Sequence, residues 1–172
     1  MGQLIFYIGG AKSGKSRLAQ ARAETWPAPR VYLATAQALD EEMAERIQKH
    51  QAERGPGWRT MEAPLEPDAA LGRLAGQESP VLFDCLTLWL SNLLGHNYDT
   101  LAALERVRDL LQAVANYSGP VLVVSNEVGG GIVPANPLAR QFRDLAGLAN
   151  QLLAARADQV ILAVAGLELK LK

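Results

Sequence analysis

A glycine-rich segment near the start of the chain has the residue types and spacing of a phosphate-binding loop. Residues 9–16 read GGAKSGKS and match the pattern G-x-x-x-x-G-K-[ST], after the apolar run 3–8 and before a helical stretch. In such a loop, successive backbone N–H groups and the N-terminus of the following helix surround phosphate oxygens. The pattern places Lys15 at the terminal phosphates and offers the Ser16 hydroxyl to Mg²⁺. The segment therefore predicts a site for a nucleoside triphosphate with its metal.

His50 is a second group with chemical potential. It lies in the run RIQKHQAER, close to Arg46, Lys49 and Arg54. These cations disfavour protonation of the imidazole, and they also suit a ligand with several negative charges. A neutral imidazole can attack phosphorus, although most isolated histidines have no chemical role. The residues alone leave both interpretations of His50 open, whereas His96, which has no basic neighbours, is expected to be structural or merely exposed.

Polar residues also follow two buried runs further along the chain. Asp84 ends the apolar run VLFD, and a carboxylate at the tip of a strand beside the phosphate-binding strand commonly supports Mg²⁺. The same side chain could cap the helix that starts near Leu86, and the two roles are compatible. The segment NEVGGGIVP (126–134) suits either a lid or a simple glycine-rich turn. Both segments are expected at the carboxyl edge of the sheet, where open α/β sheets bind ligands.

Length, composition and charge limit the class of protein. A chain of 172 residues with 49% hydrophobic and 20% charged residues is expected to form one domain, residues 1–172. A formal net charge of −1 provides no general basic field, so nucleic-acid binding is not expected. The single cysteine, Cys85, excludes an internal disulfide framework and suits a reducing compartment. Without a signal-peptide pattern or an apolar run of about 18 residues, we expect a cytoplasmic protein without membrane insertion.

Apolar, β-branched runs alternate with helical stretches along the chain. Strands are expected at 3–8, 30–36, 58–64, 80–85, 120–126 and 159–166, with 167–172 as a half-exposed edge strand. Helices are expected at 14–26, at 40–54 with Asp40 as N-cap, at 100–116 and at 136–156. The apolar stretch 85–94 is expected to be a further helix, placed either in the core or at an interface. This alternation predicts an α/β fold with a doubly wound, mostly parallel sheet.

Several segments together resemble one enzyme family. In chain order they are GGAKSGKS, YLATA, DEEMAERIQKH, WRTMEAP, FDCLTLWLSNLL, SNEVGGGIVP and RQFRDLAGLANQLLAARADQV. From about residue 4 to its end, the chain resembles the bifunctional adenosylcobinamide kinase/adenosylcobinamide-phosphate guanylyltransferases of cobalamin biosynthesis. The resemblance implies a RecA-like P-loop NTPase fold whose mostly parallel sheet ends in an antiparallel C-terminal edge strand.

The resemblance also implies two reactions in one protein. ATP or GTP would phosphorylate adenosylcobinamide. GTP would then transfer GMP to adenosylcobinamide phosphate, which releases pyrophosphate and gives adenosylcobinamide-GDP. In the family the histidine of an R-I-x-x-H motif carries the GMP, and in this chain that histidine is His50. The implied metal is Mg²⁺, held by Ser16 and Asp84, and the implied assembly is a homotrimer.

The same resemblance implies a set of site residues. Lys15 and His50 would be catalytic. The nucleotide-binding residues would be Gly9, Gly10, Ala11, Lys12, Ser13, Gly14, Lys15, Ser16, Ala34, Thr35, Ala36, Gln51, Ala52, Glu53, Arg54, Glu62 and Asp84. A carboxylate at position 62 could accept hydrogen bonds from the N1–H and amine of guanine, or form a surface salt bridge. Arg140 and Arg143 could bind phosphate or contact another subunit.

Two other functions compete with this hypothesis. The chain could be a P-loop small-molecule kinase that lacks the guanylyltransferase step at His50. It could also be a nucleotide-dependent switch ATPase without a small-molecule acceptor. Covalent labelling of His50 by GTP would exclude the first alternative. Nucleotide consumption that cobinamide stimulates would exclude the second.

Overall fold

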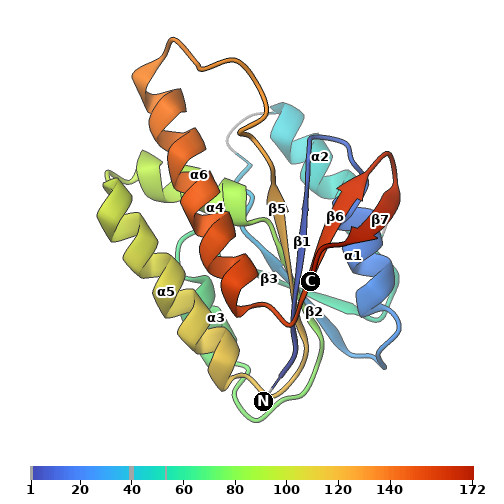
Figure 1. Cartoon of the computed structure of the whole chain (residues 1–172). Coiled ribbons are helices and arrows are strands. Elements are labelled where there is room, and N and C mark those ends of the chain that lie inside the picture. The colour runs from blue at the N-terminus through green and yellow to red at the C-terminus, as the bar shows by residue number, and fades with distance from the viewer. Residues whose placement is uncertain (1, 39–40, 53) are drawn as a thin grey trace.

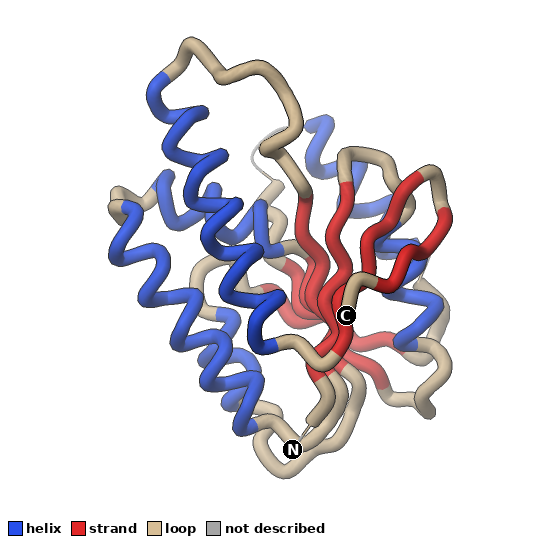
Figure 2. The backbone as a smooth tube through the Cα atoms, in the orientation of Figure 1, coloured by secondary structure: helices blue, strands red, loops and turns tan. Residues whose placement is uncertain are grey.

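The computed structural model describes residues 2–38, 41–52 and 54–172, and for residues 42, 46, 49 and 50 it describes the backbone only. Within these residues, one sheet carries helices on both faces (Figures 1 and 2). Its strands are β1 (Leu4–Gly9), β2 (Arg30–Ala34), β3 (Trp58–Glu62), β4 (Val81–Asp84), β5 (Val121–Asn126), β6 (Gln159–Val164) and β7 (Leu167–Lys170). The helices are α1 (Lys15–Ala23), α2 (Glu41–Ala52), α3 (Pro67–Gly72), α4 (Leu86–Gly95), α5 (Thr100–Asn116) and α6 (Pro137–Arg156).

The strand order decides which loops meet at the carboxyl edge of the sheet. The order is β3-β2-β4-β5-β1-β6-β7, and only the pairing of β6 with β7 is antiparallel within the described residues. The mostly parallel sheet with an antiparallel C-terminal edge strand is therefore confirmed. One expectation is wrong: β4 does not lie beside the phosphate-binding strand β1, because β5 runs between them. The loop after β5 consequently lies between the glycine-rich loop and Asp84.

Two hydrophobic layers hold the helices on the sheet. α3, α4, α5 and α6 cover one face, and α1 and α2 lie on the other (Figure 1). On the first face, apolar residues of β1, β2, β4 and β5 pack against a large cluster that includes Trp89 and Leu145, both fully buried. On the second face, Ala19 and Ala23 bring α1 close to the sheet. Continuous apolar strands are thus covered on both sides, as parallel sheets require.

The helix 85–94 belongs to the core. Leu86, Trp89, Leu90 and Leu93 of α4 are all fully buried and pack in the larger cluster. The structure therefore places the apolar face of this helix inside the molecule and leaves little of it for a subunit interface. Asp84 does not cap α4, because the N-cap residue is Cys85. The expected N-cap of α2, Asp40, lies outside the described residues.

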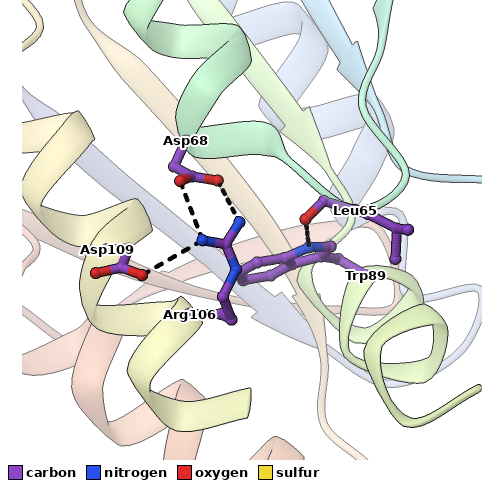
Figure 3. A network of polar contacts seen from close by, with 5 residues as sticks. All are labelled: Leu65, Asp68, Trp89, Arg106 and Asp109. Atoms are coloured by element: carbon purple, nitrogen blue, oxygen red, sulfur yellow. Dashed lines mark hydrogen bonds and ion pairs between the residues drawn. The ribbon is translucent and has the colours of Figure 1, made fainter. Parts of the chain in front are cut away.

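A polar network fixes the segment that follows β3 (Figure 3). The Trp89 indole N–H donates to the carbonyl oxygen of Leu65 at 3.1 Å, which ties this segment to α4. Arg106 of α5 donates to both carboxylate oxygens of Asp68 at 2.8 and 3.3 Å, and to Asp109 at 3.3 Å. A bidentate arginine–carboxylate pair has a defined geometry. The network therefore holds the segment 65–68, which follows β3, against α4 and α5.

The lengths and polarity of the described helices bear on whether any of them could span a membrane. Among the residues that the structure describes, no helix combines the length and apolar character needed to cross a bilayer. The longest, α6, carries Arg140, Arg143 and Asp144 within its first half.

Candidate functional site

A cavity of about 460 Å³ opens at the carboxyl edge of the sheet. The residues that line it come from the glycine-rich loop, from β2 and the loop after it, from α2, from β3 and from the ends of β4 and β5. They are Lys15, Ser16, Tyr32, Ala34, Ala36, Gln37, Ala38, Met43, Ile47, Gln51, Arg54, Thr60, Glu62, Pro64, Asp84, Cys85, Leu88 and Asn126. The size suits a small-molecule ligand, and the site lies where open α/β sheets bind nucleotides.

The glycine-rich loop has the backbone of a phosphate-binding loop. A Cβ atom on Gly9 would lie 2.4 Å from the carbonyl oxygen of Ala163, so the strand end admits no side chain there. Gly14 has a φ of 92°, a left-handed conformation that glycine adopts easily. Lys15 is only 8% exposed, and its ammonium donates to the carbonyl oxygen of Gly10 at 3.0 Å. A buried cation thus stands at the start of α1, inside the curl of the loop.

Ser13 adds a donor that the fold itself does not use. Its side chain is 8% exposed, and the hydroxyl oxygen has no hydrogen-bond partner among the described residues. Buried hydroxyls are nearly always satisfied, because an unmade hydrogen bond is costly. A phosphate oxygen in the loop would supply the missing partner, so this observation favours an anionic ligand.

Asp84, Tyr32 and Arg54 form a chain of contacts along one wall of the cavity. The Tyr32 hydroxyl donates to Oδ2 of Asp84 at 3.1 Å. The Arg54 guanidinium carbon lies 3.7 Å from the centroid of the Tyr32 ring, and Arg54 also donates to the Thr60 hydroxyl at 3.2 Å. Burial, together with the Asp84 charge, raises the pKa of Tyr32, so the phenol remains a proton donor at neutral pH.

Buried hydrogen bonds behind the cavity hold its loops in register. The Asn92 amide donates to the carbonyl oxygens of Thr35 and Pro64 at 2.8 and 2.9 Å, which joins the loops after β2 and β3. The Thr35 hydroxyl, fully buried, donates to the Cys85 carbonyl oxygen and accepts from the Cys85 N–H, both at 2.9 Å. Thr35, expected to contact the nucleotide, therefore supports the wall from behind and does not line the cavity.

Asn126 is placed by a second set of bonds. Its amide donates to the Thr87 hydroxyl at 2.8 Å, and its backbone carbonyl accepts from the buried amide of Asn150 at 3.2 Å. Asn150 in turn accepts from Ser125 at 2.7 Å. This network fixes the end of β5, which lies between the glycine-rich loop and Asp84 in the sheet.

The structure separates the expected nucleotide-binding residues into groups. Those that line the cavity are Lys15, Ser16, Ala34, Ala36, Gln51, Arg54, Glu62 and Asp84. The remaining loop residues, from Gly9 to Gly14, shape the loop without being part of the cavity wall. Ala52 is exposed and does not line the cavity. Glu53 lies outside the described residues.

The side chain of His50 also lies outside what the structure describes, but its backbone belongs to α2. Met43 and Ile47 of this helix line the cavity. Position 50 follows Ile47 by three residues, so it lies on the same face of the helix. This face of α2 is therefore the one that Met43 and Ile47 turn toward the cavity. Both side chains border a cavity there.

Several residues of the cavity wall were not among the expected site residues. Tyr32, Thr60 and Asn126 all line it. Each of them lies within or at the end of a strand that the sequence does predict. The alternation of side chains along a strand indicates which residues of that strand share a face. Which face borders the cavity, however, follows only from the strand order.

Other candidates from the sequence lie away from the cavity. His96 is exposed at the end of α4, where its Nδ1 lies 2.9 Å from the Asn92 carbonyl oxygen. Arg140 donates to the carbonyl oxygens of Pro134 and Ala135 at 2.9 and 2.7 Å, and Arg143 pairs with Asp144 at 3.1 Å. Arg140 therefore fixes residues 134 and 135, which lie just before α6. Apart from Asn126, the segment 126–134 does not line the cavity, which favours a glycine-rich turn over a lid closed on the cavity.

Cys85 lines the cavity, but its thiol is a poor nucleophile. The side chain is 5% exposed, and burial together with the nearby Asp84 charge raises the thiol pKa to about 11. The thiolate is the reactive form, and it is scarce at neutral pH. Cys85 is therefore not expected to act as a covalent nucleophile in this cavity.

The donors around the cavity fit Mg²⁺ that arrives with a nucleotide. The Ser16 hydroxyl and the Asp84 carboxylate both line the cavity. Among the described residues, no group of three or more His, Cys, Asp or Glu side chains could hold a metal alone. Mg²⁺ commonly takes one or two protein oxygens and completes its shell with phosphate oxygens and water. The residues present suit that arrangement.

Known proteins of similar sequence cover nearly the whole chain. The family model described as cobinamide kinase / cobinamide phosphate guanyltransferase matches residues 5–171. The bifunctional adenosylcobalamin biosynthesis protein CobP of Pseudomonas aeruginosa is 45% identical over 166 residues, which cover 96% of this chain and 95% of the relative. The bifunctional adenosylcobalamin biosynthesis protein CobU of Salmonella typhimurium is 44% identical over 183 residues, which cover 98% and 99% of the two chains.

Solved structures of similar fold are much more distant in sequence. A KaiC-like protein of Pyrococcus horikoshii has a TM-score of 0.54 at 11% identity, over 94% of this chain and 70% of that chain. The P4 protein of bacteriophage phi13 has a TM-score of 0.53 at 14% identity, over 98% and 53%. These likenesses concern the fold alone, and they agree with the predicted α/β fold with a mostly parallel sheet. The match over residues 5–171 and the close full-length relatives show that the chain belongs to the bifunctional cobinamide kinase/cobinamide phosphate guanylyltransferases of adenosylcobalamin biosynthesis.

Proposed function

We propose that this bifunctional enzyme carries out both reactions in the one cavity at the carboxyl edge of its sheet, and that His50 carries the guanylyl group. The observation that supports the proposal is the composition of the cavity wall. Lys15 and Ser16 of the phosphate-binding loop and Met43 and Ile47 of the His50 helix line the same space. A triphosphate held by the loop would therefore lie within the cavity that the His50 helix borders.

In the kinase reaction, the loop would hold the triphosphate of ATP or GTP. The Lys15 ammonium would stabilise the charge that develops as the terminal phosphoryl group passes to the hydroxyl of adenosylcobinamide. Ser16 and Asp84 would hold Mg²⁺, which neutralises phosphate charge when bound. Half-buried side chains in the wall limit water around the reacting groups, which strengthens these electrostatic contacts.

In the guanylyl transfer, two displacements occur at the same phosphorus atom. A ring nitrogen of neutral His50 attacks the α-phosphorus of GTP, a P–N bond forms, and the bond to pyrophosphate breaks. A phosphate oxygen of adenosylcobinamide phosphate then attacks this phosphorus, which releases the imidazole and gives adenosylcobinamide-GDP. Because the two displacements are separate, GTP and the cobinamide phosphate need not occupy the cavity together.

The intact protein should gain the mass of one GMP when it is incubated with GTP and Mg²⁺. The adduct should be acid-labile and base-stable, as a phosphoramidate is, and it should map to the peptide that contains residue 50. Addition of adenosylcobinamide phosphate should then remove it. Mass spectrometry before and after this addition tests the proposal, and an adduct that persists after the addition would contradict its second displacement.

Glu62 is proposed to read the guanine base. It lines the cavity, and a carboxylate can accept from both N1–H and the exocyclic amine of guanine, whereas adenine offers no such pair. Replacement by glutamine should reduce the preference for GTP over ATP in protein labelling by about 10-fold, the size expected for loss of a bidentate base contact. The matched control is Glu66→Gln, because Glu66 is also exposed but does not line this cavity. Equal preferences in the two variants would remove Glu62 from base recognition.

The assembly and extent of the enzyme are also part of the proposal. We propose a homotrimer in which each chain forms one catalytic domain over residues 1–172. Light scattering on the purified protein measures the mass of the assembly. A single cooperative unfolding transition would support one domain per chain. α4 is not part of the proposed subunit contact, because its apolar residues lie in the core.

A further inference from the structure

We infer that Tyr32 is a positioning residue of this site, which holds the Arg54 guanidinium with its ring and the Asp84 carboxylate with its hydroxyl. The inference rests on the proposed function, in which Arg54 and Asp84 act on the nucleotide and its metal. Tyr32 itself lines the cavity from the middle of β2. Its two contacts use different atoms, so they can be removed separately.

The ring contact fixes the end of the helix that carries His50. α2 ends at Ala52, and Arg54 lies two residues further along the chain. The guanidinium carbon of Arg54 lies 3.7 Å from the Tyr32 ring centroid, a stacking distance at which cation and ring attract strongly. The Arg54 bond to the Thr60 hydroxyl, at 3.2 Å, adds a tie to β3. The end of α2 is thereby joined to two neighbouring strands of the sheet.

This tie bears on the cavity because α2 forms part of its wall. Met43, Ile47 and Gln51 of α2 all line the cavity. Contacts that hold Arg54 therefore help to hold the part of the wall that α2 supplies.

The hydroxyl contact orients the carboxylate at the other end of the cavity wall. Tyr32 donates to Oδ2 of Asp84 at 3.1 Å, which leaves Oδ1 for other partners. β2 and β4 are paired in parallel, with Ala34 opposite Asp84, so the bond crosses between adjacent strands. An outer partner that fixes one carboxylate oxygen commonly affects metal affinity by about 10-fold or more.

The Tyr32 ring also has an aromatic neighbour that lies outside the cavity lining. Trp58 packs against it with ring centroids 6.3 Å apart and planes at 77°. Trp58 does not line the cavity, so it supports Tyr32 without reaching a ligand there. A change at Trp58 therefore separates a general loss of packing from the loss of the ring face that Arg54 uses.

Two variants of Tyr32 test the two contacts. Tyr32→Phe keeps the ring and removes the hydroxyl, so Mn²⁺ should bind about 10-fold more weakly in the presence of a GTP analogue with a methylene bridge between the α- and β-phosphorus atoms. Electron paramagnetic resonance of free Mn²⁺ measures this affinity. Tyr32→Leu also removes the ring, so the single-turnover rate of GMP attachment at saturating GTP and metal should fall about 100-fold. In Tyr32→Phe that rate should stay within about 3-fold of the wild type, because the face that holds Arg54 remains.

Control variants make the result specific. Tyr7→Phe removes another tyrosine–carboxylate bond of 3.1 Å, to Glu168. Neither residue lines the cavity, so this variant should leave metal affinity unchanged. Trp58→Leu should leave the labelling rate within about 3-fold. Because Tyr32→Leu and Arg54→Leu remove the same contact, the double variant should label no more slowly than the slower single variant.

The outcomes separate this inference from the proposed function. A wild-type protein that acquires no GMP would contradict the proposed function itself. Wild-type labelling together with additive losses in the double variant would overturn the link between Tyr32 and Arg54. Unchanged Mn²⁺ affinity in Tyr32→Phe would overturn the link to Asp84. Thermal unfolding by circular dichroism shows whether each variant is folded, and if Tyr32→Leu unfolds, Tyr32→Met carries the same test.

Discussion

Replacing His50 by alanine should abolish the attachment of GMP to the protein while GTP still binds. The imidazole is the proposed nucleophile, and removing a nucleophile from a covalent mechanism commonly costs a factor of about 1,000 or more. The phosphate-binding loop and the cavity wall remain, so the dissociation constant for GTP should change by less than about 5-fold. Labelling with GTP that carries radioactive phosphorus at the α-position measures the attachment of GMP. Isothermal titration with GTP measures the dissociation constant.

His96→Ala is the matched control for this experiment. His96 is the other histidine of the chain, and it is exposed at the end of α4, outside the cavity. This variant should label at the wild-type rate. Equal labelling of His50→Ala and the wild type would show that another residue accepts the GMP. Loss of labelling with retained cobinamide phosphorylation in His50→Ala would confirm that the two chemical steps use different groups.

Replacing Lys15 by alanine should weaken GTP binding and reduce both activities. Lys15 is 8% exposed and stands inside the glycine-rich loop, with its ammonium 3.0 Å from the Gly10 carbonyl oxygen. In this setting a charge-assisted hydrogen bond to phosphate contributes about 1.5–3 kcal/mol, which is roughly a 10- to 150-fold change in dissociation constant. Stabilisation of the transition state by the same charge should add a loss of about 100-fold in the rate of phosphoryl transfer.

Lys12→Ala is the control for the charge of the loop. Lys12 belongs to the same loop, but it is exposed and does not line the cavity. It should therefore bind GTP within about 3-fold of the wild type, since exposed charges contribute little. Titration of the two variants at the same ionic strength compares them directly. Unchanged GTP affinity in Lys15→Ala would mean that the triphosphate does not lie in this loop.

Most elements of the fold follow from local patterns in the sequence. The strands at β1, β2, β4, β5 and β6 are continuous apolar runs, and each was expected within a few residues of its observed bounds. The expected bounds are generally too long, because apolar character continues into loops after the ladder ends. β3 ends at Glu62, for example, although the apolar pattern reaches Pro64.

The helix α3 was not expected, and its sequence explains why. It spans only Pro67–Gly72, too short for an amphipathic period to be visible. Proline at its first position is favourable for a helix start, but it is equally typical of a turn. What selects the helix is packing: Ala70 and Leu71 are buried in the core, and Asp68 is held by Arg106 of α5.

The candidate site likewise combines residues that local sequence patterns place with residues that only the tertiary structure places. Lys15 and Ser16 could be placed from sequence, because the loop, its glycines and the helix after it are all local. Asp84 lines the same cavity, but the sequence predicts its strand beside β1, and β5 lies there instead. Crossover helices allow strands to be inserted between sequence neighbours, so spatial order does not follow chain order.

The sequence by itself determined the chemistry that this protein can attempt: a triphosphate loop at 9–16, a histidine on a basic helix and a buried, mostly parallel sheet. Each of these depends on residues within about one turn or one strand of each other. Only the tertiary structure decided which wall those groups share. Tyr32 reaches Asp84 and Arg54 across three separate segments of the chain, and no local period encodes such a contact. It exists because the strand order brings β2 between β3 and β4, so that side chains distant in sequence face one cavity.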